Sequence, residues 1–290
     1  MKKVLVIGSS VCDVIININQ IPRIGEDENI ISQSFHIGGC AFNVSSMLKY
    51  FDIPFDLFSP VGQGVYGEFV RKVLIEENIP ILLETDINNG CCYCLVDKSG
   101  ERTFICEHGG EYYFKQEWFQ QLNSHDYEYV YICGLEVEED SGKYIIEFLK
   151  QNPHLKIIFA PSPRINNIDK NRINTIFSLS PILHLNDKEI LSYTQKQTIE
   201  EASHYLYKKT NNIIIVTLGD KGCYYYDGHH HYFDSIPTKV VDTIGAGDSH
   251  IGTMIAMMYK NIDLDNCMIE ANRIASLVVS QKGARLKQTV

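Results

Sequence analysis

The sequence predicts an α/β protein with a doubly wound, mostly parallel sheet and a smaller β-sheet beside it. Three observations lead to this prediction. An apolar run at residues 4–8 ends in glycine and is typical of a parallel strand buried on both faces. From residue 126 onward, strand-like and helix-like segments alternate regularly, which favours a parallel sheet. Short β-rich segments within 15–37 and 81–106 predict the smaller sheet, outside the main layer.

Composition narrows the class of protein. The 290 residues are 44% hydrophobic and 21% charged, which is ordinary for one large globular domain. A net charge of -10 argues against nucleic-acid partners, because non-specific binding needs Lys and Arg at the phosphates. No apolar run approaches the length of a membrane span. Nine cysteines and no leader-like start indicate buried free thiols and a reducing, cytoplasmic setting.

The first part of the chain places polar residues after predicted strands. Asp13 follows the first strand, at the sheet edge where ligands bind in open α/β folds, although it could also be a turn aspartate. The Pro, Gly and acidic residues of 21–27 predict a hairpin instead of a crossover helix. Gly38 and Gly39 then allow close approach of a ligand. Asn43, in the first turn of the next helix, could bind hydroxyls or cap that helix.

Residues 62–67 suggest a rival interpretation. They match the pattern G-x-G-x-x-G after a predicted strand at 55–61 and before a predicted helix at 68–77. This pattern is typical of dinucleotide binding and supports a nicotinamide-dependent oxidoreductase as an alternative. The match is weak, because the pattern does not follow the first strand of the sheet, where such a fingerprint usually lies.

Two later strands end in polar patterns. Asn186 and Glu189 open a helix three residues apart, so they share one face and could hold a hydrated Mg²⁺. The same pair could instead form a capping box. Thr217, Gly219 and Gly222 follow the next strand and offer a hydroxyl and an accessible backbone to phosphates. They are also consistent with a hairpin turn.

A glycine loop precedes an apolar helix near the C-terminus. Gly245 and Gly247, with Ala246 between them, let the backbone expose N–H groups at a helix N-terminus, which favours an anion. Asp248 follows, and its carboxylate suits removal of a proton from an attacking hydroxyl. A simple capped turn is the alternative. Because such loops gather at one edge of an open α/β sheet, we expect the groups needed for phosphoryl transfer to share one cleft.

Together these motifs resemble the ribokinase-like (PfkB) family of carbohydrate and nucleoside kinases. Residues 242–248, Asp-Thr-Ile-Gly-Ala-Gly-Asp, match the C-terminal signature of that family without a departure. The other matches are Gly8 with Asp13, Gly38-Gly39 with Asn43, the Asn-x-x-Glu motif at 186–189 and the nucleotide loop at 217–222. The resemblance extends in the same order from residue 4 to Ala284.

The resemblance implies one ribokinase-like kinase domain over 1–290, with a β-sheet lid from about 14–37 and 90–108. It implies transfer of the γ-phosphoryl group of ATP to a hydroxyl of a sugar or sugar derivative, with a nucleoside as the alternative acceptor. Asp248 would be the catalytic base. The backbone of Gly245, Ala246 and Gly247 would form the anion hole.

Further roles follow from the same resemblance. Substrate binding falls to Asp13, Gly38, Gly39, Asn43 and Glu136. ATP binding falls to Asn186, Thr217, Gly219, Gly222 and Asn272, the last near the adenine. Mg²⁺ falls to Glu189 and Asn186, acting through water. Asp242 and the Gly283 turn resemble a loop that binds K⁺ in part of the family, and a lid strand can supply a homodimer interface there.

The sequence departs from the family pattern at two positions. Gly64 stands where members often have an acid, and Cys40 stands where ribokinase-like sequences have lysine, so ribose itself is not implied. Phe35 or Tyr93 in the lid could stack a nucleoside base. A degenerate, non-enzymatic binding protein is a further hypothesis, which the intact 245–248 motif disfavours.

Overall fold

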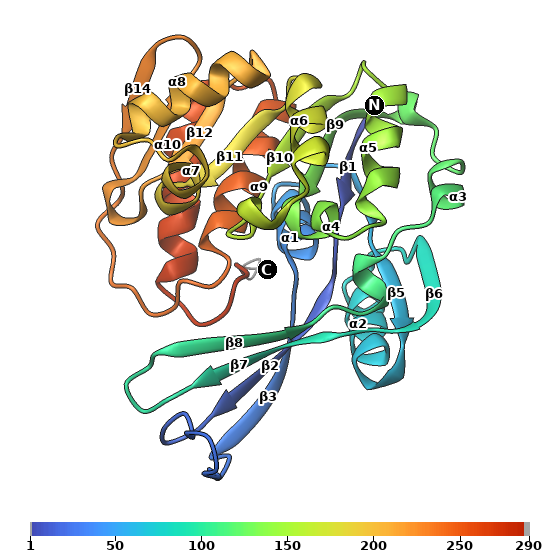
Figure 1. The fold of residues 1–290 in the computed structure, drawn as a ribbon, viewed down its shortest axis with the longest axis vertical. Helices are drawn as coiled ribbons and strands as arrows, with labels where there is room; N and C mark the ends of the chain where they lie inside the picture. Colours follow the sequence, from blue (N-terminus) through green and yellow to red (C-terminus); the bar gives the residue numbers. More distant parts are fainter. Residues whose placement is uncertain (1, 287–290) are drawn as a thin grey trace.

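The main sheet of the computed structural model, which describes residues 2–286, has eight strands in the order β14-β13-β12-β11-β10-β9-β1-β4 (Figure 1). All neighbours from β12 to β4 are parallel, whereas β13 and β14 extend the sheet in antiparallel fashion. The strands are β1 (Lys3–Ile7), β4 (Phe55–Phe58), β9 (Tyr127–Cys133), β10 (Lys156–Ala160), β11 (Ile182–Asn186), β12 (Ile214–Thr217), β13 (Cys223–Tyr226) and β14 (His230–Phe233). The predicted mostly parallel sheet is confirmed.

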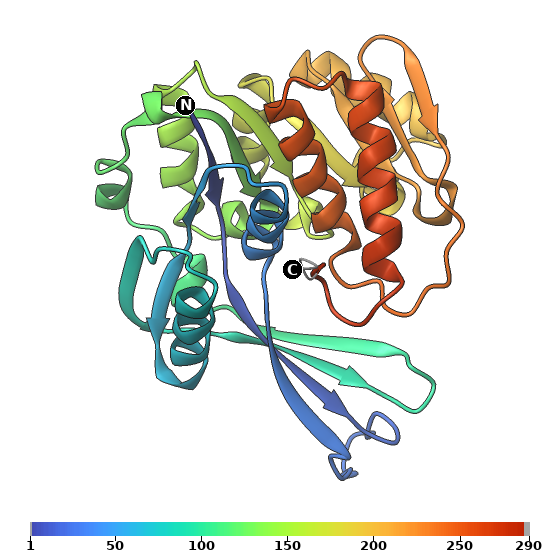
Figure 2. The same cartoon turned by 180° about the vertical axis from the view of Figure 1, so that it is seen from behind.

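Helices cover both faces of this sheet, and the two views in Figures 1 and 2 show one layer each. One layer contains α4 (Gly134–Glu138), α5 (Gly142–Gln151), α6 (Lys170–Ser178), α7 (Asp187–Thr194) and α8 (Ile199–Thr210). The other contains α1 (Cys40–Tyr50), α9 (Ala246–Tyr259) and α10 (Leu264–Val279). Alternate strand residues supply the two cores: in β9, Val130 and Ile132 pack on one side, and Tyr129 and Tyr131 on the other.

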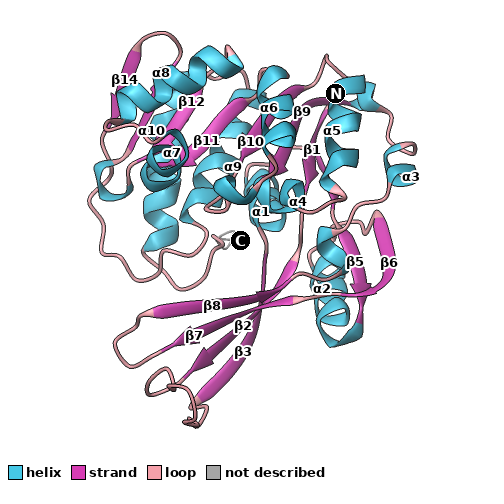
Figure 3. Cartoon of the chain, viewed as in Figure 1, coloured by secondary structure: helices cyan, strands magenta, loops and turns pink. Residues whose placement is uncertain are grey.

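A four-stranded sheet projects from this body (Figure 3). Its order is β3 (Ser32–Gly38), β2 (Val11–Asn17), β7 (Cys91–Val96) and β8 (Arg102–Glu107). The predicted hairpin is present, since β2 and β3 pair in antiparallel fashion. We call these four strands the small sheet. Short helical turns complete the chain: α3 (Gln116–Phe119) and the 3₁₀ turns Gly110–Tyr112, Ser124–Asp126, Ile165–Asn167 and Gly219–Lys221.

The predicted strand at 55–61 proves to be two strands in different sheets. After Ser59 the chain leaves the main sheet and forms β5 (Pro60–Gln63), which pairs only with β6 (Leu83–Asn88) within the described residues. Proline fits the first position of a strand, because it has no N–H to donate. The next helix, α2 (Gly64–Glu76), starts earlier than predicted.

The glycines of the G-x-G-x-x-G pattern serve packing in this side region. A Cβ on Gly62 would lie 2.2 Å from the carbonyl oxygen of Ile87, and one on Gly67 would lie 2.3 Å from that of Gly62. The glycines therefore let β5, β6 and α2 pack closely. The pattern does not follow a strand of the main sheet, so the dinucleotide-binding interpretation is wrong.

Two of the loops with candidate site residues do not follow strands of the main sheet, contrary to our expectation. The Gly38-Gly39 turn follows β3 of the small sheet, and α9 follows the long loop 234–245 instead of a strand. The nine cysteines are all free, but only six are buried; Cys40 and Cys92 are partly exposed and Cys106 is exposed. Within residues 2–286, no helix has the length and apolar character needed to cross a membrane.

Candidate active site

The N-terminus of α9 is shaped by its glycines. Gly245 adopts φ 75°, and a Cβ there would lie 2.3 Å from the Cβ of Ala284, so both conformation and space require glycine. A Cβ on Gly247 would meet nothing within 4 Å, so the space beside it is open. The first N–H groups of a helix have no intrahelical partners. This end of α9 can therefore receive an anion.

Asp248 lies in the first turn of α9 and contacts the first half of the chain. The Nδ2 of Asn43 donates a hydrogen bond to its Oδ2 over 2.8 Å. Burial raises the pKa of Asp248, although hydrogen bonds from Asn43 and from the thiol of Cys40 favour the ionised form. The structure thus brings together two predicted site residues 205 positions apart, and leaves the base candidate with raised proton affinity.

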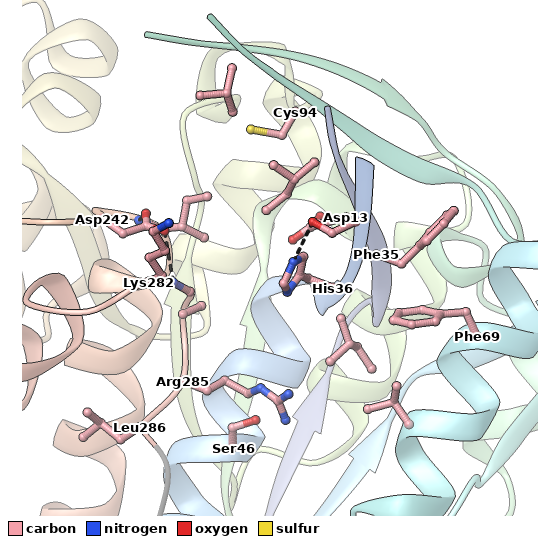
Figure 4. A pocket seen from close by; sticks show the side chains of 18 of the residues that line it. Asp13, Phe35, His36, Ser46, Phe69, Cys94, Asp242, Lys282, Arg285 and Leu286 are labelled. Carbon is pink, nitrogen blue, oxygen red and sulfur yellow. Dashed lines mark hydrogen bonds between the residues drawn. The ribbon is translucent and has the colours of Figure 1, made fainter. Parts of the chain in front are cut away.

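Asp13 is the second carboxylate of this region. Burial, and then the nearby charge of Asp248, raise the pKa of Asp13 to about 7. Asp13 lines a cavity of about 1120 Å³, together with His36, Asp242 and Arg285 (Figure 4). The ionised form of Asp13, disfavoured by burial and by a neighbouring charge, would gain from a ligand hydroxyl that hydrogen-bonds it.

Gly38 and Gly39, the two glycines before α1, pack closely around Asp13 and the start of β2. A Cβ on Gly38 would lie 2.1 Å from Asp13 Oδ2. Gly39 adopts φ 92°, and its Cβ would lie 2.4 Å from the carbonyl oxygen of Ser9. Both glycines are therefore needed for the β3–α1 turn to pack against β2. The close approach of Gly38 leaves room for the carboxylate of Asp13.

Glu136 lies behind this turn. Its side chain has 0% exposure, and its Oε1 accepts a hydrogen bond from the backbone N–H of Ser9 at 2.8 Å. Its Oε2 has no partner among the described residues. Burial raises the pKa of Glu136. The structure gives Glu136 a supporting position, and its approach to a substrate stays a prediction.

Asn186 and Thr217 meet at the ends of β11 and β12, where they are paired in register. Asn186 Oδ1 accepts from the backbone N–H of Glu189 at 2.8 Å, and Glu189 Oε2 accepts from that of Asn186 at 2.9 Å. This is the capping box that the sequence left open. Burial, followed by the charges of Asp187 and Asp248, raises the pKa of Glu189, so this side of the site lies near Asp248.

The capping box leaves part of the pair available. Asn186 Nδ2 and Glu189 Oε1 make no hydrogen bond to other described residues. Residues 2–286 contain no cluster of three or more His, Cys, Asp or Glu side chains that could enclose a metal. A hydrated Mg²⁺ needs only one or two carboxylates besides phosphate oxygens and water. Glu189, with Asp248 nearby, fits that requirement.

The predicted nucleotide loop combines a packed glycine and an open one. A Cβ on Gly222 (φ 94°) would lie 2.0 Å from the carbonyl oxygen of Phe233, so this glycine is needed for β14 to pack. Gly219 (φ 63°) faces open space, since a Cβ there would meet nothing within 4 Å. Thr217 Oγ1 is 3.4 Å from the carbonyl oxygen of Leu185. The hairpin alternative is also correct, since β13 follows at once, yet the turn keeps an accessible surface.

Asn272 and Asp242 are both engaged by protein groups. Asn272, 7% exposed on α10, donates through Nδ2 to the carbonyl oxygens of Phe233 (3.3 Å) and Asp234 (3.1 Å), so its place near adenine stays a prediction. Asp242 is close to the Gly283 turn, as predicted. Its carboxylate also accepts a hydrogen bond from Arg102 Nη1 at 2.7 Å.

Three contacts of the site were not predicted. Arg102 lies 140 positions from Asp242, and no local pattern marks it. Cys40 was noted only as a departure, yet its side chain lowers the pKa of the base candidate, Asp248, against the effect of burial. His184 and His250 form a buried pair at 2.9 Å that joins β11 to α9. A histidine inside the apolar run 182–185 was a usable signal for that pair.

The fold and site define a ribokinase-like kinase. The family model described as "pfkB family carbohydrate kinase" matches residues 1–289. The chain therefore belongs to the pfkB family and is a carbohydrate kinase, in the broad sense of a kinase of sugars or nucleosides. This membership also overturns the nicotinamide-dependent oxidoreductase alternative.

Similar proteins cover nearly the whole chain. A protein of Escherichia coli (strain K12), named as the uncharacterised sugar kinase YegV, is 30% identical over 288 residues, covering 97% of this chain and 90% of its own. A nucleoside kinase of Thermoplasma acidophilum is 28% identical over 273 residues, covering 92% and 86%.

Solved structures show the same fold. The ribokinase of Thermotoga maritima superposes with a TM-score of 0.85 at 22% identity, covering 98% of this chain and 95% of its own. The Arabidopsis thaliana ribokinase complexed with ribose and ATP gives 0.80 at 19% identity, with 98% and 95% covered.

Proposed function

We propose that this protein transfers the γ-phosphoryl group of ATP to a hydroxyl of a sugar or sugar derivative, with Asp248 as the base. The observation that carries the proposal is the position of Asp248: its carboxylate stands at the open N-terminus of α9 and bonds Asn43 across the site. A proton acceptor and an anion cradle at one point suit attack of a hydroxyl on a phosphoryl group.

In this proposal the acceptor hydroxyl lies between Asp13, Asn43 and Asp248. Asp248 takes the hydroxyl proton, and its raised pKa brings it nearer the value that makes a general base efficient at neutral pH. The backbone N–H groups of Gly245 to Gly247 hold the oxygens of the transferred group. Because they are fixed by the helix, they need no reorganisation during the reaction.

The nucleotide would lie along the ends of β11 and β12. Thr217 and Gly219 offer a hydroxyl and an open backbone surface to the phosphates. Asn186 Nδ2 is available as a donor, and Glu189 would hold Mg²⁺ through water. When bound, Mg²⁺ supplies neutralisation of the phosphate charge. The Arabidopsis structure with ribose and ATP supports ATP as the donor for a chain of this fold.

The small sheet would act as a lid over the acceptor and as the interface of a homodimer. Four isoleucines, each more than half exposed, support the second role: Ile24, Ile30 and Ile31 in the connection between β2 and β3, and Ile105 on β8. The nine free cysteines support a reducing compartment such as the cytoplasm.

A nucleoside is the second candidate acceptor. In one row of the small sheet, Ile15 pairs with Cys94 and Cys94 with Phe104, and all three line the cavity. Phe104 is 53% exposed there and could stack a base. The two aromatics considered from the sequence fit less well: Phe35 packs against Phe69, and the Tyr93 hydroxyl bonds Tyr66.

The test is release of ADP from ATP and Mg²⁺ with single sugars and nucleosides. We expect one class of acceptor to raise ADP release far above the rate without acceptor. The Asp248→Asn variant, which keeps the shape of the side chain, serves as the catalytic blank. Equal ADP release by this variant and the wild type would overturn Asp248 as the base, and no acceptor-dependent release with any compound would overturn the proposed activity.

A further inference from the structure

One ion pair joins the small sheet to the loop that leads into α9. Arg102, the first residue of β8, donates from Nη1 to Asp242 Oδ1 at 2.7 Å. The side chain of Asp242 is 8% exposed and that of Arg102 is 26% exposed, so water screens this pair only partly. Both residues line the cavity. Figure 4 shows that Asp242 lies on the side of the cavity opposite Asp13.

Asp242 organises the loop through its other contacts. Its Oδ1 also accepts from the backbone N–H of Ile244 at 2.9 Å, and its Oδ2 accepts from that of Gly283 at 3.0 Å. Ile244 directly precedes Gly245, whose φ of 75° starts α9. Gly283 precedes Ala284, against which Gly245 is packed. The carboxylate therefore fixes both segments that shape the anion cradle.

This arrangement does not fit a monovalent cation at Asp242. A K⁺ ion needs oxygen ligands, whereas three N–H groups already point at this carboxylate. One of them belongs to a guanidinium, which stays charged and would repel a second cation. Burial raises the pKa of Asp242, but hydrogen bonds from Arg102, Ile244 and Gly283 outweigh burial and hold that pKa below its ordinary value. The buried carboxylate already has its counter-charge.

We propose that Arg102 is a positioning residue that supplies, from the small sheet, the positive charge that orders loop 242–247, so that this chain needs no monovalent cation for its anion cradle. This role of Arg102 in the anion cradle rests on the proposed kinase function. It goes beyond that function because Arg102 lies outside the family motifs. It also couples the small sheet to the phosphoryl site through one contact.

The experiment compares KCl, NaCl and tetramethylammonium chloride at equal ionic strength, with the melting temperature and ATP turnover as readouts. We expect the wild type to melt at one temperature and to turn over equally, within about twofold, in all three salts. For Arg102→Met we expect kcat/KM to fall about tenfold, the scale of a lost charged hydrogen bond. Its melting temperature should now rise in KCl by roughly 3 °C relative to tetramethylammonium chloride.

Two variants control for general effects. Lys98→Met removes a positive charge from the β7–β8 turn, where the side chain forms no ion pair with other described residues, and should behave as the wild type. Arg102→Lys keeps the charge and should show no response to KCl even if Arg102→Met does not fold.

A severalfold activation or a specific stabilisation of the wild type by KCl would overturn the proposal. So would an Arg102→Met variant that matches the wild type in every salt. The melting measurements need no acceptor. They therefore decide the role of Arg102 even if no acceptor releases ADP, an outcome that would contradict the proposed function alone.

Discussion

The acceptor side and the nucleotide side of the site differ in how far the protein has already satisfied its own polar groups. On the nucleotide side, Asn186 and Glu189 bond each other in a capping box before any ligand arrives. On the acceptor side, Asp13 and Asp248 are close enough for the charge of one to raise the pKa of the other. The first side therefore forms hydrogen bonds within the protein without a ligand, whereas the second leaves Asp13 with a pKa raised by burial and by the charge of Asp248. Variants on the acceptor side should therefore change chemistry and pH behaviour, and variants on the nucleotide side should change binding.

The largest effect is expected for Asp248→Asn. Loss of the base should lower kcat by about 1000-fold, within the range of general-base contributions. Binding of ATP, measured by calorimetry, should stay within about threefold of the wild type. Asparagine has the size of aspartate and can still form hydrogen bonds at the start of α9. A variant that retained more than a tenth of the wild-type kcat would contradict the role of Asp248 as the base, and with it the assignment of the chemical step to the acceptor side.

Asp13→Asn tests whether burial and the charge of Asp248 raise the pKa of Asp13. The pKa of Asp13 in the folded protein, about 7, exceeds the ordinary value of 3.8 for an aspartate, so the native state binds the extra proton more tightly. Stability should therefore fall as pH rises from about 4 to 7, and the cost should be complete above pH 7.

The Asn variant should lose this decline and be more stable than the wild type at pH 8, by roughly 1–3 kcal/mol. Urea unfolding at pH 5, 6, 7 and 8 measures the difference. Its KM for the acceptor should rise at the same time. Parallel stability profiles for the two proteins would contradict the raised pKa of Asp13.

Glu189→Gln separates the two roles of the nucleotide side. Glutamine can still complete a capping box, so unfolding free energy should change by less than about 0.5 kcal/mol. The lost charge should raise the Mg²⁺ concentration needed for half-maximal turnover by about tenfold. Glu189→Ala is the matched variant and should lose about 1 kcal/mol of stability as well. If the Gln variant needed the same Mg²⁺ concentration as the wild type, the role of Glu189 would be limited to capping α7.

Gly219→Ala should have the smallest effect on the reaction. The new Cβ meets nothing within 4 Å, so the cost is the left-handed backbone alone, about 1 kcal/mol. The KM for ATP should nevertheless rise several-fold, because the methyl group enters the open surface. Gly222→Ala is the contrast: its Cβ would lie 2.0 Å from a carbonyl oxygen, so thermal melting should show a much larger loss.

The sequence predicts the fold well where strands are buried on both faces. Strands β9 to β12 are rich in apolar residues, and their positions are confirmed to within a few residues. The division at Ser59 could not be predicted, because β4 and β5 are both mostly apolar and differ in the strands with which they pair. The start of α9 after a long loop, and not after a strand, also depends on tertiary contacts.

The site follows the same division. Glycine patterns marked the turns at Gly39 and Gly245 because positive φ angles leave a trace in the sequence. The Arg102–Asp242 pair left none, since arginine is common on exposed strands and its partner is 140 positions away. Glu136 shows the opposite case: the sequence marked a polar residue after a strand, but only burial shows that it faces the protein interior.

The alternation along β2 has a consequence for how specificity can diverge. Asp13, Ile15 and Asn17 line the cavity, whereas Cys12 and Val14, on the opposite face of the strand, are fully buried in the core. Odd-numbered positions can thus be exchanged to suit a different acceptor while even-numbered positions keep the strand anchored. One seven-residue strand thus carries two alternating sets of side chains, one that faces the cavity and one that packs in the core. Substitutions in one set can occur without substitutions in the other.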